Sequence, residues 1–354
     1  MNRVVVTGMG VVTPVGNDVK TFWDSLISGK CGVDFITKFD ASDFKVRIAA
    51  EVKDFDPSLY MEKGEIRKTD LYAQYAMAAA VQAMEDSGLD GKVDPERLGV
   101  YIGSGIGGMQ TFMEEHLKLL QKGARRISPL FIPMMISNMA DGNISIKTGF
   151  KGINFAPVTA CATSSHAVGE AFRNIKHGYL DACITGGAEA AITPLALAGF
   201  ANMGALTESE DPDRASIPFD AERSGFVMAE GSTILVLEEL EHAKARGAHI
   251  YAEIVGYGAT GDAYHITSPS PTGEAAARGM QLSFEEAGLT AEDVDYINAH
   301  GTSTPLNERY ETIAIKKALG EDKAARTPVS STKSVTGHLL GAAGATEALV
   351  CALA

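Results

Sequence analysis

The first chemical signal in the chain is a single cysteine, Cys161, that lies between an apolar run and a helical pattern. Residues 153–159 combine β-branched and aromatic side chains, which predicts a strand. Residues 163–177 repeat apolar side chains at helical spacing, which predicts a helix. Cys161 would then lie at the first turn of this helix, where free amides and the helix dipole favour a thiolate. Because a lone cysteine is more often a small buried hydrophobic residue, other parts of the chain must decide its role.

Three further residues with chemically useful side chains lie in the C-terminal part of the chain. His300 follows a predicted strand at 295–298, in NAHGTSTPLN, while Lys333 and His338 stand in SSTKSVTGHLLGAAGATEA. We place Lys333 in a turn equivalent to that of Cys161, and His338 at the start of a helix rich in glycine and alanine. Each has a plain alternative, since such a histidine is often a local hydrogen-bonding group and such a lysine is usually solvated.

Together these four side chains suit the chemistry of thioesters. A thiolate attacks an acyl thioester and holds the acyl group covalently. Histidines donate hydrogen bonds to a developing enolate or oxyanion, or move protons near neutral pH. A lysine charge lowers nearby pKa values or orients a carboxylate.

The elements that must position these residues occur twice. Residues 4–10 and 253–258 each combine a β-branched strand with Gly-x-Gly, and residues 78–105 and 278–301 each give a helix, a Gly-Leu stop, an acidic linker and a strand. Residues 155–172 and 326–349 each give a strand ending in Pro-Val, a turn of small residues and a helix. Chance similarity between generic α/β units is the alternative.

The repeat predicts two similar α/β halves, residues 1–250 with insertions and residues 251–354, that form a layered αβαβα body. Strand ends and helix N-termini would converge on one crevice between the halves, where ligands bind in such folds. After its turn the first copy adds strands at 182–185 and 225–237, which have no counterpart in the second copy. We therefore expect a chain truncated at its C-terminus, without its final strands.

Composition limits the setting and the partners. The net charge of −14 argues against nucleic acid as a partner. The four cysteines, at positions 31, 161, 183 and 351, show no metal-binding or disulfide spacing. The weakly polar stretch 192–206 is too short and too broken to cross a membrane, and no leader segment opens the chain. We expect a cytoplasmic protein without a metal, a cofactor or a membrane partner.

The segments TACATSSHA, NAHGTSTPLN and SSTKSVTGHLLGAAGATEA resemble the three active-site motifs of the β-ketoacyl-[acyl-carrier-protein] synthases. The similarity is closest to the elongating, synthase II type of fatty-acid synthesis and runs through the whole chain. It implies a thiolase-type fold, a homodimer, and a decarboxylative Claisen condensation. Cys161 would accept the acyl chain, and malonyl carrier would lose CO2 to give a carbanion that attacks this thioester. His300 and His338 would stabilise the enolate, and His300 is a candidate for activating a water that takes up CO2.

The resemblance also implies supporting roles for other residues. Lys333, together with Glu347, would hold His338 and the local charge in order. Thr302 and Thr304 would hydrogen-bond the pantetheine arm of the carrier, although threonines in a turn often bond only their own backbone.

An acyl carrier protein is the partner that the resemblance implies. It is acidic, and Lys63, Arg67 and Lys68 form a basic cluster that would steer it despite the net negative charge of the chain. Arg125 and Arg126 are further candidates, and a solvated helix face is the alternative. Residues 108–139 would contribute to the dimer interface, with Met134, Met135 and Ile136 lining the acyl site of the partner subunit.

Other classes of protein fit the sequence less well. Gly103, Gly105 and Gly108 match a dinucleotide fingerprint, but a charged helix follows where that fold needs a second strand. Initiating synthases pair the cysteine with histidine and asparagine, and thiolases use a second cysteine, for which Cys351 stands too far along. A polyketide-type ketosynthase, or an inactive carrier-binding fragment, remains the alternative function.

Overall fold

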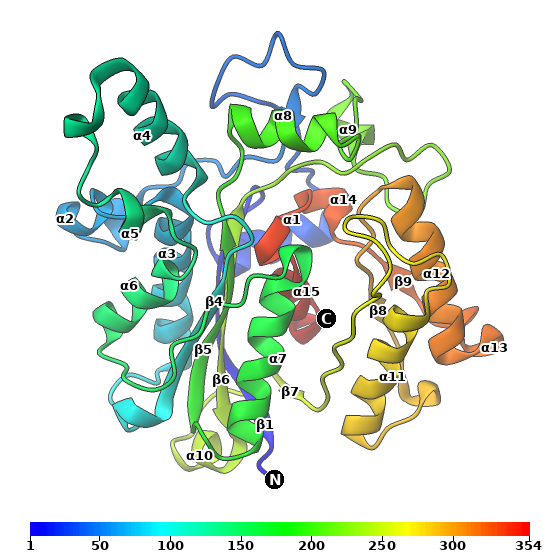
Figure 1. Ribbon diagram of the computed structural model, residues 1–354. Helices are drawn as coiled ribbons and strands as arrows, with labels where there is room; N and C mark the ends of the chain where they lie inside the picture. Colours follow the sequence, from blue (N-terminus) through cyan, green and yellow to red (C-terminus); the bar gives the residue numbers. More distant parts are fainter.

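The structure is a computed structural model that describes all residues from 1 to 354. Its centre is a five-stranded sheet with the order β4-β5-β6-β1-β7, and β8 pairs with β9 in a separate two-stranded parallel sheet (Figure 1). The strands are β1 (Val4–Val12), β2 (Asp34–Phe35), β3 (Ile48–Ala49), β4 (Leu98–Gly103), β5 (Ala182–Glu189), β6 (Gly231–Glu239), β7 (Ala252–Ile254), β8 (Ile297–Asn298) and β9 (Val329–Ser330).

Helices cover both faces of the central sheet. They are α1 (Val19–Ile27), α2 (Lys63–Ile66), α3 (Leu71–Ser87), α4 (Met109–Lys122), α5 (Phe131–Met135), α6 (Met139–Thr148), α7 (Thr163–Lys176), α8 (Pro194–Asn202), α9 (Pro212–Ala215), α10 (Leu240–Ala245), α11 (Glu274–Ala287), α12 (Pro305–Leu319), α13 (Glu321–Ala324), α14 (Lys333–Thr336) and α15 (Ala343–Leu353). None of them combines the length and the apolar character that a membrane crossing requires.

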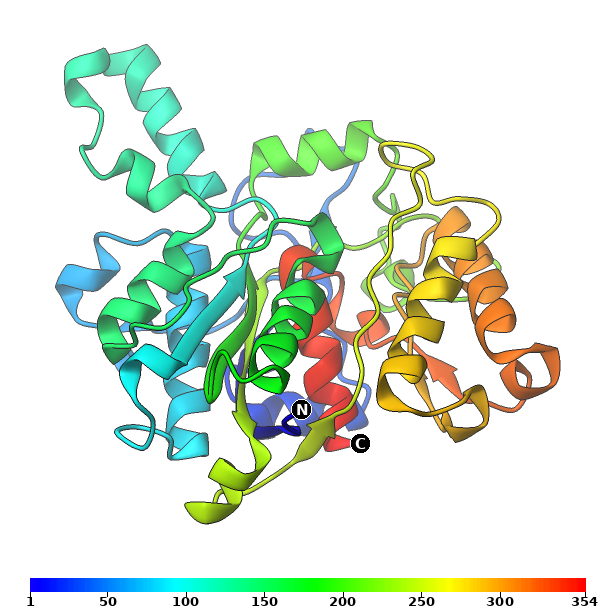
Figure 2. The same cartoon turned by 60° about the horizontal axis from the view of Figure 1, so that its bottom comes forward.

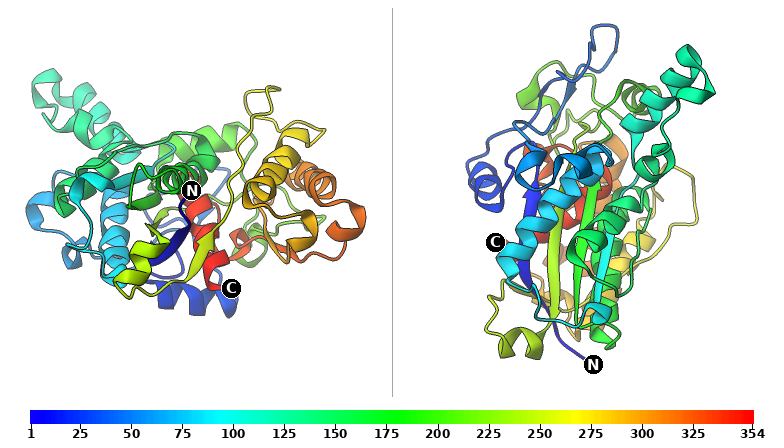
Figure 3. Two further views of the ribbon diagram at one scale, coloured as in Figure 1. Left: turned by 90° about the horizontal axis from the view of Figure 1, so that it is seen from below. Right: turned by 90° about the vertical axis from the view of Figure 1, so that its left-hand side faces the viewer.

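The layers follow from the alternation of side chains along the strands. Val100 and Ile102 of β4 belong to one apolar cluster with α3 and α6, whereas Tyr101 between them belongs to a second cluster with α7 and α15. Both faces of the strand are therefore buried, which explains its continuous apolar sequence. Figure 3 shows α3 on one side of the sheet, and Figure 2 shows α7 and α15 side by side on the other.

Small residues allow these layers to approach closely. α3 is rich in alanine, and a side chain at Gly10 of β1 would clash with the backbone oxygen of Ala79 in this helix. Gly8 meets Ala83 in the same way one turn further along. The many glycines and alanines of the sequence therefore set the distance between α3 and the sheet.

The predicted repeat is visible in the structure. Both helices before the glycine stops, α3 and α11, end at a glycine in the left-handed conformation, Gly88 at φ 57° and Gly288 at φ 69°. In each half a strand then pairs in parallel with the segment before the next turn: Val100 with Asn154, and Ile297 with Val329. In the first half β5 and β6 lie between β4 and β1, but in the second half β8 and β7 do not pair.

One detail of the sequence prediction was wrong. The segment 153–159 is not a regular strand, because only Asn154 forms a bridge and the chain leaves the sheet before Pro157, which has no N–H to continue a ladder. Beyond the predicted boundary at residue 250, β7 pairs with β1 and so extends the sheet of the first half. The strands predicted near 182–185 and 225–237 are present as β5 and β6.

Candidate active site

Cys161 lies at the centre of a short 3-10 turn, Ala160–Ala162, that leads into α7. The turn starts with Ala160 in the left-handed conformation at φ 52°, and the Thr163 hydroxyl accepts a hydrogen bond from the Thr159 amide at 2.8 Å. The prediction of a helix at 163–177 is confirmed, but Cys161 precedes its first turn rather than lying within it. The half-buried thiol therefore sits on a sharply turned backbone at the end of a strand-like segment.

The same kind of turn occurs in the second half at Leu340–Ala342, which leads into α15 and begins with Leu340 at φ 49°. By this match the equivalent of Cys161 is Gly341. Pairing Cys161 with Lys333 from sequence was wrong, because Lys333 begins the separate short helix α14. The error arose because both segments consist of small polar residues, so the sequence alone does not determine how the two copies align.

His338 contacts the sulfur of Cys161. Its Nε2 lies 3.0 Å from Cys161 Sγ, and its Nδ1 accepts a hydrogen bond from the Leu340 amide at 3.2 Å. Because Nδ1 is the acceptor, the neutral ring carries its proton on Nε2 and donates it toward the sulfur. The backbone of His338 is held by Val227 and Ala229, so the residue lies in an extended bridge and does not begin a helix, as the sequence had indicated.

His300 faces the same site from the other half. Its ring centroid is 5.3 Å from that of His338, at an interplanar angle of 84°. Its Nδ1 lies 3.5 Å from the ammonium group of Lys333, so this ring also carries its proton on Nε2. The carboxylate of Glu311 accepts from the amides of His300 and Gly301, at 2.6 and 2.9 Å. Sequence reasoning missed Glu311, although its place on the helix that follows the motif was a usable signal.

Lys333 is almost fully buried and serves His300 rather than His338, contrary to the prediction. Its Nζ donates to the carbonyl oxygen of His300 at 2.7 Å and forms an ion pair with Glu347. Glu347 is thus confirmed as its neighbour. The buried cation therefore has a carboxylate, a carbonyl and an imidazole nitrogen as partners, which compensates its desolvation.

Burial controls protonation in this site. Burial first, and the Lys333 charge second, lower the pKa of His300 to about 3, and the same causes hold the pKa of His338 well below its usual range. Both rings are therefore neutral at pH 7, and each offers one N–H. Burial also raises the pKa of the Cys161 thiol and outweighs the lowering by Lys333, so in the free protein burial opposes the thiolate that the start of a helix would favour.

The three groups suit hydrogen-bond donation better than metal binding. The ligand atoms of Cys161, His300 and His338 lie within 4.8 Å of one another, as in a cation site. A metal on Nε2 of His338 would, however, place the ring proton on Nδ1, which faces the Leu340 N–H instead of an acceptor. The ammonium of Lys333 beside His300 would also repel a cation.

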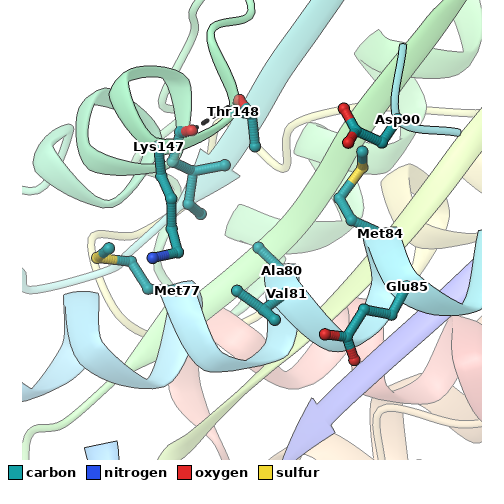
Figure 4. Close-up of a pocket in the computed structure, with 9 residues that line it drawn as sticks. Met77, Ala80, Val81, Met84, Glu85, Asp90, Lys147 and Thr148 are labelled. Atoms are coloured by element: carbon teal, nitrogen blue, oxygen red, sulfur yellow. Dashed lines mark hydrogen bonds between the residues drawn. The ribbon is translucent and has the colours of Figure 1, made fainter. Parts of the chain in front are cut away.

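A hollow of about 270 Å³ opens onto this cluster and is lined by Cys161, Ala162, Ser165, His300 and Glu347. A second hollow of about 260 Å³ lies between α3 and α6, with Met77, Met84 and Lys147 among its lining residues (Figure 4). It contains no histidine and no cysteine. Only the first hollow therefore combines a nucleophile with hydrogen-bond donors.

The other predicted residues are placed as follows. Thr302 is buried and Thr304 half-buried, and their hydroxyls are 2.9 Å apart. Lys63, Arg67 and Lys68 lie exposed on and just after α2, and none of them forms an ion pair.

The structure also explains the glycine pattern after β4. A side chain at Gly103 would clash with Thr163, and one at Gly108 with the backbone of Met134. Gly105 instead donates its amide to the carboxylate of Glu189. Helices, not a second strand, follow this turn. These glycines therefore serve close packing, and the pattern is not a dinucleotide fingerprint.

Comparison with known proteins identifies the family. The chain matches the N-terminal domain of the β-ketoacyl synthases over residues 1–243 and their C-terminal domain over residues 251–354. The chain therefore belongs to the β-ketoacyl synthase family. The 3-oxoacyl-[acyl-carrier-protein] synthase 2 of Staphylococcus aureus (strain COL) is 53% identical over 352 residues, which are 99% of this chain and 85% of that protein. A protein of the same name from Coxiella burnetii is 54% identical over 354 residues, with the same two coverages.

Solved structures of ketosynthases confirm the thiolase-like α/β fold. The ishigamide ketosynthase/chain length factor matches with a TM-score of 0.92 and 35% identity, over 99% of this chain and 85% of that chain. A type II polyketide ketosynthase in complex with its acyl-carrier protein matches with a TM-score of 0.90 and 37% identity, over 99% of this chain and 86% of that chain. A β-ketoacyl synthase from Burkholderia phymatum has a TM-score of 0.90 and 36% identity, and the match again covers 99% of this chain and 86% of the other.

The protonation state of Cys161 generates a first prediction. The rate at which iodoacetamide alkylates Cys161, followed by peptide mass spectrometry, should rise about tenfold per pH unit from pH 7 to 8 without a plateau, because burial raises the thiol pKa. Lys333→Ala should slow alkylation at pH 8 several-fold, because the Lys333 charge lowers the thiol pKa and its removal raises that pKa. Lys316→Ala, at an exposed position, should leave the alkylation rate unchanged. A plateau below pH 8, or faster alkylation of Lys333→Ala, would contradict this account.

Proposed function

We propose that this chain is an elongating β-ketoacyl-[acyl-carrier-protein] synthase of type II fatty-acid synthesis. The observation that carries the proposal is the convergence of two neutral imidazoles on the Cys161 sulfur, one of them at 3.0 Å, within a chain of this family. The enzyme transfers an acyl chain to Cys161 and condenses it with malonyl carrier, which gives a 3-oxoacyl carrier and CO2. The reaction requires no cofactor and no metal.

In the first step the Cys161 thiol loses its proton to solvent, and the thiolate attacks the acyl thioester. A new C–S bond forms, the C–S bond to the carrier breaks, and the carrier leaves as a thiolate that takes up a proton from solvent. Because burial raises the pKa of the Cys161 thiol, the resting protein holds mainly the thiol. We propose that the Nε2–H of His338, directed at the sulfur, stabilises the small thiolate population that reacts. Nε2 already carries a proton in this tautomer, so His338 acts as a donor rather than as a base.

In the second step the bond between the malonyl carboxylate and its α-carbon breaks. CO2 leaves, and the electron pair gives an enolate whose oxygen receives hydrogen bonds from Nε2–H of His300 and His338. The α-carbon then attacks the Cys161 thioester, a C–C bond forms, and the thiolate leaves. Since its pKa of about 3 makes His300 a weak base, we assign it hydrogen-bond donation rather than activation of water.

Three further residues support these steps in our proposal. Lys333 fixes the Nδ1 side of His300, and Glu347 balances the lysine charge. Thr302 and Thr304, whose hydroxyls already meet, would bond the pantetheine arm of the carrier. We also place the division between the halves at residue 250, and the reaction in the reducing cytoplasm, which suits a nucleophile that is a free thiol.

The relatives favour fatty-acid synthesis over a polyketide pathway. The two relatives named 3-oxoacyl-[acyl-carrier-protein] synthase 2 are 53% and 54% identical to this chain, whereas the polyketide ketosynthase with its carrier is 37% identical. We therefore do not propose the polyketide function, nor that of an inactive fragment.

Acylation of a single cysteine tests the function directly. After incubation with an acyl carrier protein, mass spectrometry should find the acyl group on Cys161, and Cys161→Ala should carry none. An acyl group on Cys31, Cys183 or Cys351 would contradict the mechanism. In a second arm, Cys161→Gln should still decarboxylate malonyl carrier, and added His300→Ala or His338→Ala should slow this by about 10² to 10³, the usual cost of a lost oxyanion donor.

We propose that the carrier docks on the exposed basic cluster Lys63, Arg67 and Lys68. Arg67→Glu/Lys68→Glu should raise KM for acyl carrier at least tenfold without changing the reaction of a small acyl thioester. The matched control Lys30→Glu/Lys45→Glu makes the same charge change at other exposed positions and should leave KM unchanged. Equal effects of the two pairs would show that only net charge matters.

We also propose that the chain forms a homodimer through the edge that precedes Cys161, in continuity with residues 108–139. Ile153, Phe155 and Val158 are 45, 43 and 54% exposed, and the backbones of Asn154 and Ala156 between them make no hydrogen bond. An apolar edge with free backbone groups favours pairing with a second copy. Under this proposal Met134, Met135 and Ile136 face the acyl site of the partner subunit.

Sedimentation equilibrium tests the dimer. The wild-type protein should have twice the chain mass of 37.3 kDa. Ile153→Asp/Val158→Asp should shift it to the monomer, because buried unpaired carboxylates are costly at an interface. Ile146→Asp, at a 79% exposed position on α6, should leave the dimer intact. A monomeric wild-type protein at micromolar concentration would refute the proposal.

A further inference from the structure

The candidate active site is built on a buried carboxylate that the sequence did not reveal. Glu189 is the last residue of β5, has no exposed surface, and forms no ion pair with a basic side chain. One of its oxygens accepts from the Ser104 hydroxyl at 2.8 Å and the Ile106 amide at 3.2 Å. The other accepts from the amides of Gly105 at 2.8 Å and Gly341 at 3.1 Å. Four donors from two distant segments therefore hold one carboxylate.

The bond to Gly341 connects Glu189 to His338. Leu340 and Gly341 are consecutive residues of one 3-10 turn. The Leu340 amide donates to Nδ1 of His338, and the Gly341 amide donates to Glu189. The turn also packs closely against the Glu189 carboxylate, since a Cβ at Gly341 would lie 2.8 Å from a Glu189 oxygen. The direction of the Leu340 amide thus depends on how the carboxylate holds the next residue.

We propose that Glu189 is a positioning residue that fixes this turn and, through the Leu340 amide, the tautomer and orientation of the His338 ring. The inference rests on the proposed function, in which Nε2–H of His338 must point at the reacting atoms. With the carboxylate in place, Nδ1 has an N–H donor opposite it and the proton stays on Nε2. Without it, the Leu340 amide is free to turn away, and Nδ1 and Nε2 become comparable sites for the proton.

The repeat gives this proposal independent support. The equivalent turn in the first half places the Cys161 amide where the second half has the Gly341 amide, and the Cys161 amide donates no hydrogen bond to another residue. A turn that begins in the left-handed conformation directs its amides at an anion. In the second half Glu189 is that anion, built into the fold. In the first half the position is left free beside the nucleophile.

The alternative is that Glu189 only stabilises the fold. Glu238, at the opposite end of the same strand pair, provides the matched control. It is equally buried, pairs with Ala182 in register, and is held by Thr7 and Arg246 instead of the 3-10 turn. Glu189→Gln and Glu238→Gln both remove one buried negative charge. Only Glu189→Gln replaces an acceptor of the Gly341 amide.

The experiment uses Cys161→Gln as parent and measures decarboxylation of malonyl carrier. Added Glu189→Gln should lower kcat about 10²-fold with KM unchanged, because a displaced hydrogen-bond donor loses its alignment. Added Glu238→Gln should leave both constants unchanged. Equal kcat in the parent and in the Glu189→Gln variant would overturn the inference, whereas a parent that does not decarboxylate would overturn the proposed function instead.

A spectroscopic readout separates positioning from general destabilisation. In protein labelled with ¹⁵N-histidine, the His338 signals, assigned by their loss in His338→Ala, should show the Nε2–H tautomer in the wild type and a mixture in Glu189→Gln. Glu189→Asp keeps the charge and should restore part of both readouts. If Glu189→Gln does not fold, Ser104→Ala decides, since it removes one of the two donors that hold the carboxylate oxygen opposite Gly341. Unchanged decarboxylation and an unchanged tautomer in folded Ser104→Ala would then refute the proposal.

Discussion

The site depends on how closely the two halves approach at a single junction. Cys161 and His338 are 177 residues apart in sequence, yet their sulfur and nitrogen are 3.0 Å apart. This contact requires the two 3-10 turns to meet without intervening side chains. A Cβ at Gly344 of α15 would clash with the hydroxyl of Ser165 in α7, and one at Gly187 of β5 would lie 2.6 Å from the backbone oxygen of Gly341. Small residues at this junction thus bring nucleophile and donor together.

Close packing then determines the electrostatics. The same exclusion of water lowers the pKa of both histidines and raises that of the thiol, so burial keeps the three groups neutral. Lys333 pushes the equilibria in different directions, because its charge opposes protonation of the histidines but favours the thiolate. A neutral site with two N–H donors is suited to negative charge that arises only during the reaction. Hydrogen bonds formed mainly in the transition state accelerate a reaction without trapping the substrate.

Much of this arrangement could be predicted from the sequence, and the remainder shows where local patterns fail. The glycine stops at Gly88 and Gly288 mark both helix ends correctly, because a left-handed cap is a property of a few adjacent residues. The histidine that Lys333 contacts could not be predicted from adjacent residues in this way. Whether its ammonium reaches His300 or His338 depends on how the turn before α14 packs against the His300 loop, and on nothing in the sequence next to it. The rise in the pKa of the Cys161 thiol could not be predicted for a related reason, since burial is a property of the assembled fold.

The register of the repeat was the most instructive error. Small polar residues surround both Cys161 and Lys333, so composition aligned them, whereas backbone conformation aligns Cys161 with Gly341. The match between Cys161 and Gly341 also explains the chemistry of the two turns, which the match between Cys161 and Lys333 did not. Two copies of one turn present an amide in the same way: one copy carries a thiol and leaves its amide free, and the other has no side chain and binds the carboxylate of Glu189. A nucleophile turn and an anchoring turn are thus alternative uses of the same backbone geometry, and the fold places them face to face.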